Sequence, residues 1–223
     1  MPSRFADRVE AGRRLAEDLG QYAGQAAVIV LGLPRGGVPV AFEVAHALGV
    51  PMDVFIVRKL GVPGHEEFAM GAIASGGALL LDADIVRQAG IGEGELQRVV
   101  ETEQRELDRR ERQYRGDRPP PDVAGRTVIL VDDGLATGAS MRVAIAALRQ
   151  EHPARVIAAV PIAPIETCDM LRGEADEVVC AVTPEPFYAV GIWYDDFSQT
   201  TDDEVHDLLE RARNELAPAP PRR

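Results

Sequence analysis

Short apolar runs closed by turn-forming residues alternate with helical patterns along most of the chain. The runs expected to be strands cover residues 26–33, 52–57, 126–131, 154–162 and 176–182. They are too short for typical helices, and they lack the polar alternation of a sheet with one wet face, which indicates strands buried on both faces. Because helical patterns lie between them, the sequence favours an α/β fold with a doubly wound, mostly parallel sheet.

Helices are expected where apolar residues recur at helical spacing or where opposite charges lie four apart. The expected helices cover residues 4–22, 38–48, 93–118, 141–150, 165–172 and 202–216. We interpret 93–118 as a charged, solvated helix supported by its own ion pairs. The glycine-rich stretch 60–82 is too punctuated for a core element, so we expect a flexible loop with short strands at 69–75 and 78–82. Residues 217–223 are expected to be a frayed tail.

Composition limits the class of protein. The 223 residues, 46% of them hydrophobic, suffice for a single domain spanning 1–223 with a packed core. A net charge of -12 disfavours nucleic acid and anionic membranes as partners. Cys168 and Cys180 match neither paired zinc-ligand spacing nor a disulfide framework and fit a reducing cytosol. No apolar run is long enough for a signal core or a membrane span, so we expect a soluble cytoplasmic protein.

The most informative segment is VILVDDGLATGAS at 128–140. Two carboxylates, Asp132 and Asp133, follow a buried strand, and a turn of small residues then leads into a helix. In open α/β sheets ligands bind at that end of the strands. Backbone N–H groups at the helix start can cradle a phosphate, and ionised carboxylates can accept hydrogen bonds from the vicinal hydroxyls of a ribose. The segment therefore predicts a site for a phosphorylated sugar.

This segment resembles the signature of the type I phosphoribosyltransferases: an apolar strand, two acids, a short variable turn, then Thr-Gly-x-Ser or Thr. The resemblance implies an enzyme that transfers the 5-phosphoribosyl group of 5-phosphoribosyl 1-pyrophosphate (PRPP), with Mg²⁺, to a nitrogenous, purine-like acceptor. Pyrophosphate would be released. Beside the two acids, which would also hold the metal, the residues that it assigns to PRPP are Ala136, Thr137, Gly138, Ala139 and Ser140.

Paired aspartates after a strand are not unique to that family. They also occur in phosphoryl-accepting receiver domains and beside nucleotide-bound magnesium in P-loop proteins. The latter need a Gly-Lys-Ser/Thr phosphate loop. Lys59 is the only lysine of the chain and is followed by Leu60, so that motif is absent.

A second loop, LPRGG at 33–37, resembles the pyrophosphate loop of the same family. The resemblance implies a cis peptide bond between Pro34 and Arg35 and backbone N–H groups, including those of Gly36 and Gly37, directed at the pyrophosphate. An ordinary turn from strand to helix is the alternative.

Arg58 and Lys59 resemble the Arg-Lys pair that precedes the flexible loop of adenine and orotate phosphoribosyltransferases. With Arg35, they would be the catalytic cations that stabilise the departing pyrophosphate. Because such cations sometimes act across subunits, the resemblance favours a homodimer. A solvated lysine at a strand edge is the alternative.

An aromatic-rich segment, 183–200, is expected to form a small hood on the acceptor side. A weak resemblance to the 6-oxopurine enzymes implies that Phe187 stacks on a base and that Asp195 helps to hold magnesium, and Trp193 and Tyr194 are further candidates for stacking. Ala136 stands where those enzymes place an acidic residue, so the acceptor stays open. The aromatic residues could equally be the edge of the core.

Two other functions stay open on the sequence alone. A PRPP-binding regulator without transferase activity would keep the fold and bind RNA or DNA through a basic face, which this acidic composition does not indicate. Hydrolysis of PRPP without an acceptor is the third possibility.

Overall fold

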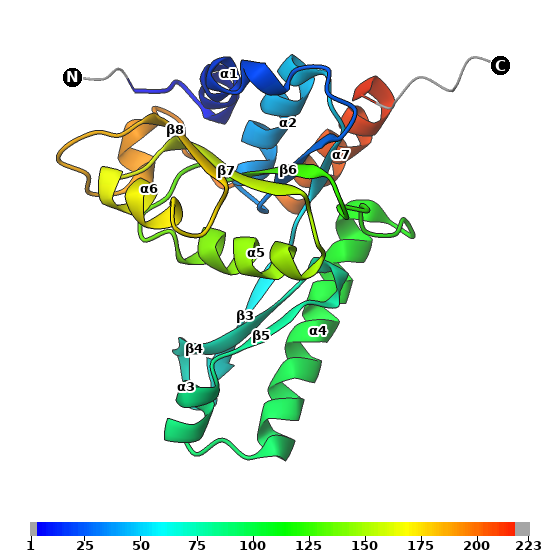
Figure 1. The fold of residues 1–223 in the computed structure, drawn as a ribbon, viewed down its shortest axis with the longest axis vertical. Coiled ribbons are helices and arrows are strands. Elements are labelled where there is room, and N and C mark those ends of the chain that lie inside the picture. Colours follow the sequence, from blue (N-terminus) through cyan, green and yellow to red (C-terminus); the bar gives the residue numbers. More distant parts are fainter. Residues whose placement is uncertain (1–3, 217–223) are drawn as a thin grey trace.

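The computed structural model describes residues 4–216 and shows a five-stranded parallel sheet with helices on both faces (Figure 1). The strand order is β2-β1-β6-β7-β8, and every neighbouring pair is parallel. The strands are β1 (Val28–Gly32), β2 (Met52–Val54), β6 (Thr127–Val131), β7 (Arg155–Ile162) and β8 (Glu177–Val182). The structure confirms the doubly wound, mostly parallel sheet.

Strand β6 shows why these apolar runs carry no polar alternation. Val128 and Leu130 belong to a core cluster with α5 (Ala139–Gln150) and α6 (Ile165–Leu171). Ile129 and Val131 point to the other face, into a cluster with α1 (Arg8–Asp18) and α2 (Gly37–Leu48). Figure 1 shows α1 and α2 above the sheet and α5 below it. Both faces of the strand are covered, so all of its buried positions, Val128–Val131, are apolar.

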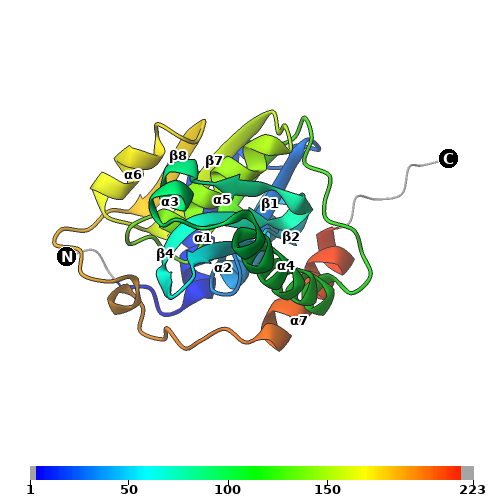
Figure 2. The same ribbon diagram turned by 90° about the horizontal axis from the view of Figure 1, so that it is seen from below.

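A second, antiparallel sheet covers much of residues 60–82, and β3 (Val57–Val62), β4 (His65–Ala74) and β5 (Leu79–Leu81) pair in that order. The short strands expected at 69–75 and 78–82 are present as parts of β4 and β5, but the segment is more regular than the expected loop. Leu60, Met70 and Ile73 are buried in a cluster that includes residues of α4 (Glu93–Arg115), the helix shown beside this sheet in Figure 2. The helix α3 (Ala83–Gln88) and the short 3-10 turn Ser75–Gly77 complete this part of the chain.

The charged helix α4 ends at Arg115, so it is shorter at its C-terminal end than the expected range of 93–118. Expected ion pairs such as Glu106–Arg110 are present, with 2.8 Å between carboxylate and guanidinium. The helix is nevertheless not wholly solvated, because Tyr114 and Arg115 are buried. Arg115 donates to Asp53 of the parallel sheet, with Nε and Oδ1 2.8 Å apart. The C-terminal end of α4 therefore joins the two sheets.

The terminal regions differ in part from expectation. The helix expected over 4–22 is α1, followed by a 3-10 turn at Gly20–Tyr22, while the last helix, α7, covers Asp202–Leu216 as expected. The tail 217–223 lies outside the described residues. None of the helices within 4–216 is both long enough and apolar enough to span a membrane.

The two cysteines also differ from expectation. Cys168 of α6 and Cys180 of β8 form a disulfide. A strand and a helix bring them together, which a separation of 12 residues does not reveal.

Candidate functional site

Two loops meet at the carboxyl ends of adjacent strands. Gly32 of β1 is paired with Val131 of β6, so the turn after β1 lies beside the Asp132–Asp133 pair. A Cβ atom added at Gly36 would lie 2.0 Å from Oδ2 of Asp133, and one added at Gly37 would lie 2.6 Å from the carbonyl oxygen of Val131. Real Cβ contacts are essentially never that short, so glycine is required where this backbone passes the acids.

A cavity of ≈ 320 Å³ opens at this junction. Five of the residues singled out from the sequence contribute to its wall, together with apolar side chains of α5, the turn after β1 and the 55–57 segment. The lining residues are Leu33, Pro34, Phe55, Val57, Arg58, Lys59, Asp132, Ser140 and Val143. The structure thus brings the first acid, the start of α5, the Pro34 turn and the Arg58–Lys59 pair into one site.

Asp132 is the acid that faces the cavity. Burial, and then the charge of the adjacent Asp133, raises the pKa of its carboxyl well above the ordinary value. A hydrogen bond from the backbone N–H of Asp133 to Oδ1, 2.9 Å long, offsets only part of this effect. A cation or a set of hydroxyl donors in the cavity would favour the charged form.

Asp133 faces a different partner, Arg8 of α1, which was not among the residues predicted from the sequence. Both Nε and a terminal nitrogen of Arg8 lie 2.8 Å from Oδ2 of Asp133. Burial raises the pKa of Asp133, and the Arg8 guanidinium opposes that effect. The pair joins residues 125 positions apart, and no spacing in the sequence could have indicated it.

The small-residue turn leads directly into α5. Gly138 has φ of 71°, a conformation that favours glycine, and α5 begins at Ala139. The first amides of a helix have no acceptor within the helix, so this end can bind an anion. Ala136, Thr137, Ala139 and Ser140 are exposed, whereas Gly138 is buried.

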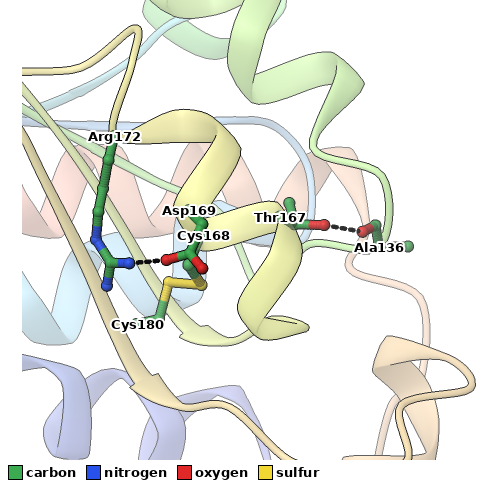
Figure 3. Close-up of a disulfide and its surroundings, with 6 residues drawn as sticks. All are labelled: Ala136, Thr167, Cys168, Asp169, Arg172 and Cys180. Carbon is green, nitrogen blue, oxygen red and sulfur yellow. Dashed lines mark hydrogen bonds and ion pairs between the residues drawn. A yellow bond between two sulfur atoms is a disulfide. The ribbon is translucent and has the colours of Figure 1, made fainter.

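Helix α6 lies against this turn, and Figure 3 shows its Thr167 bonded to Ala136. The hydroxyl of Thr167 donates to the carbonyl oxygen of Ala136 over 2.7 Å. A Cβ at Gly138 would lie 2.9 Å from the Cγ2 of Thr167. The next residue, Cys168, is held to β8 by its disulfide with Cys180. The turn therefore rests on a helix that is itself fixed.

The three predicted catalytic cations have different surroundings. Lys59 is exposed and lines the cavity. Arg58 also lines it, but its guanidinium pairs with Glu103 of α4 at 2.6 Å. The peptide bond between Pro34 and Arg35 is cis, as the resemblance implied, while the Arg35 side chain lies 4.0 Å from Asp202 of α7. Arg35 does not line the cavity.

The aromatic hood is only partly as expected. Phe187 lines a separate cavity of ≈ 580 Å³ with Pro164 and Glu166. Trp193 is half-buried, and Tyr194 is buried with its hydroxyl donating to the carbonyl oxygen of Asp133 over 2.5 Å. Tyr194 is therefore engaged in the scaffold and not free to stack on a base.

The expected metal set is not assembled. Asp195 is exposed and lies 3.6 Å from Arg4, and within residues 4–216 no group of three acidic, histidine or cysteine side chains could hold a metal. Asp132 alone supplies a carboxylate to the cavity. Mg²⁺ is commonly bound by one or two carboxylates plus substrate phosphates and water, so this donor set fits a metal that arrives with a phosphorylated ligand.

Comparison with known proteins identifies the family of the chain. The family model described as a phosphoribosyl transferase domain matches residues 5–190. A Mycobacterium tuberculosis protein, present in two strains and provisionally named a phosphoribosyl transferase, is 47% identical over 215 residues. The match covers 96% of this chain and 48% of that protein, so the chain spans about half the length of the curated relatives it matches.

A solved structure is similar over nearly the whole chain. The crystal structure of TT1426 from Thermus thermophilus is 46% identical and matches with a TM-score of 0.81. The match covers 93% of this chain and 98% of that one. With the family model matching 5–190, the chain belongs to the phosphoribosyl transferase family.

Proposed function

We propose that the protein binds PRPP with Mg²⁺ and transfers its phosphoribosyl group to a nitrogenous, purine-like acceptor, releasing pyrophosphate. The observation that carries the proposal is the single cavity lined by Asp132, Ser140 and Lys59. These residues offer acceptors for the sugar hydroxyls, an anion site at a helix start, and a cation.

Each part of PRPP has a candidate partner. The amides from Ala136 to Ser140, with the Thr137 and Ser140 hydroxyls, would bind the 5-phosphate. Asp132 would accept hydrogen bonds from the ribose diol and ligate the metal. The N–H groups of Arg35 and Gly36 would face the pyrophosphate, since Pro34 has no N–H and that of Gly37 donates to the carbonyl oxygen of Leu33 over 3.0 Å. The pyrophosphate would also interact with the cations Arg58 and Lys59 that line the cavity.

The transfer replaces one bond at C1 of the ribose with another. An acceptor nitrogen forms a bond to C1 of the ribose as the C1–O1 bond breaks, and the electron pair of that bond leaves with pyrophosphate. Where the acceptor nitrogen carries a hydrogen, as in a purine, its proton is released to water. Positive charge develops on the sugar and negative charge on the leaving group, so catalysis rests on positioning and electrostatics. Bound Mg²⁺ would neutralise charge on the pyrophosphate oxygens. Lys59 would stabilise the same charge from the protein side.

The test is release of pyrophosphate from PRPP and MgCl₂ in the presence of a panel of purines, pyrimidines and pyridines. Acceptor-dependent release supports transfer and identifies the acceptor class. Release without any acceptor would indicate hydrolysis, and binding of PRPP without release would indicate a regulator. The homodimer stays a prediction, which light scattering on the same sample tests.

A further inference from the structure

One arginine touches two separate segments beside the proposed site. The guanidinium of Arg8 donates to Oδ2 of Asp133, with contacts of 2.8 Å, and to the carbonyl oxygen of Ser198 at 2.7 Å. It also lies 4.1 Å from the centroid of the Phe197 ring. Its side chain is only 12% exposed, and that of Asp133 15%. A charged group so enclosed needs all of its partners.

Arg8 belongs to a longer contact between the start of the chain and the aromatic-rich segment 183–200. We call residues 192–198 the strap. The backbone N–H of Phe5 donates to Trp193, and those of Asp195 and Asp196 donate to Phe5 and Ala6, each over 2.9 Å. These backbone hydrogen bonds align the strap with residues 4–6, and Arg8 then fixes its far end at Ser198.

The strap and Arg8 together hold Asp133 through its side chain and its backbone. Arg8 binds Oδ2 of the carboxylate, and the Tyr194 hydroxyl donates to the backbone carbonyl oxygen. Turning the carboxylate toward a ligand would leave a largely buried guanidinium without its partner. On its other side, Oδ2 of Asp133 packs against the Gly36 backbone, where an added Cβ would lie 2.0 Å from it. Asp132, by contrast, lines the cavity.

We propose that Arg8 is a positioning residue that commits Asp133 to the strap, so that Asp132 alone of the two acids serves PRPP and its metal. The inference rests on the proposed function and changes the role of the second acid. Arg8 then sets the position of the strap against the end of β6. A change at Asp133 or at Arg8 should therefore also move the strap.

The first test does not depend on PRPP. Trp193, the only tryptophan of the chain, lies inside the strap and reports its packing through fluorescence. Arg8→Met is compared with Arg13→Met, because Arg13 lies on the same helix but is exposed and pairs with Glu43. We expect Arg8→Met to shift the emission to the red and to raise quenching by acrylamide by about twofold, as a looser strap requires. Arg13→Met should match the wild type.

Arg8→Lys keeps the inference testable if Arg8→Met does not fold. Lysine retains the charge but lacks the planar fork that reaches Asp133 and Ser198 together. We expect acrylamide to quench Trp193 more strongly in Arg8→Lys than in the wild type. Asp133→Asn should likewise loosen the strap and raise the quenching. Emission and quenching unchanged in Arg8→Lys and Asp133→Asn would overturn the proposed role of Arg8.

The second test separates the two acids. Calorimetric titration of PRPP with MgCl₂ should show that Asp132→Asn weakens binding at least about tenfold more than Asp133→Asn, a difference of about 1.4 kcal/mol. Equal losses in the two variants would refute the division of roles. If the wild type itself fails to bind PRPP, the proposed function is rejected together with the role of Asp132. The fluorescence result still decides whether Arg8 holds the strap.

Discussion

The close approach of the Pro34–Gly37 turn to the acid pair can be tested by adding one methyl group. Gly36 has φ of -61° and ψ of -33°, values that alanine adopts without strain. A Cβ there would nevertheless lie 2.0 Å from Oδ2 and 2.7 Å from Cγ of Asp133, and 3.4 Å from Nε of Arg8. The substitution Gly36→Ala must therefore displace either the turn or the ion pair.

The size of the effect follows from these two possibilities. Inserting a methyl group into a packed site costs about 1–3 kcal/mol, and breaking a buried ion pair costs about 3–5 kcal/mol. Because the pair keeps some exposure, we expect a loss of about 3 kcal/mol in the free energy of unfolding. For a chain of this size that corresponds to a fall in Tm of about 6–12 °C.

Denaturant and thermal unfolding measure this loss, with Gly94→Ala as the matched control. Gly94 lies in α4, and an added Cβ meets no atom within 4 Å. Alanine should there stabilise the helix by up to about 1 kcal/mol. Equal stability of Gly36→Ala and the wild type would show that the turn can move away from Asp133, and the packing argument would fail.

Three further substitutions have expected outcomes. The pKa of Asp132 in the folded protein lies above its ordinary value of 3.8, so the folded state binds this proton more tightly than the unfolded state. The resulting contribution to stability is complete below pH 3.8 and is lost as pH rises through the raised pKa. Asp132→Asn should therefore have a higher Tm than the wild type at about pH 7, a difference that disappears near pH 3 in pH-dependent melting curves. Thr167→Val removes the donor to Ala136 and should weaken binding of PRPP about fivefold in calorimetry, the value of one hydrogen bond near 1 kcal/mol; unchanged affinity would show that α6 does not support the turn. Lys59→Arg should lower the rate of pyrophosphate release about tenfold with a smaller change in PRPP affinity, since a guanidinium does not replace a compact ammonium, and equal rates would remove Lys59 from the catalytic set.

The parallel sheet could be predicted because its strands are buried on both faces. In β6, alternate residues enter the clusters of opposite faces, which produces the continuous apolar run. The antiparallel sheet could be predicted only in part: short strands were expected within β4 and at β5, but β3 and the full length of β4 were not, because glycines interrupt them and their pairing shifts register between Leu60 and Val62. Its apolar residues, such as Met70, are buried by the distant helix α4.

Part of the candidate site could also be predicted from the sequence, and part could not. The Asp132 to Ser140 segment is contiguous, so its chemistry could be predicted from local sequence. The partner of Asp133 could not, since Arg8 lies 125 residues away and reaches it through tertiary packing. The sequence left Tyr194 open between stacking on a base and packing at the edge of the core; Tyr194 is buried, and its hydroxyl donates to the backbone of Asp133.

Calorimetric titration of PRPP into the protein with MgCl₂ tests the central claim most directly. The account predicts binding of one PRPP per chain in the wild type, its loss in Asp132→Asn, and full retention in Asp117→Asn, a substitution at an exposed acid. Absence of binding in the folded wild type, or equal affinity in Asp132→Asn, would contradict the account.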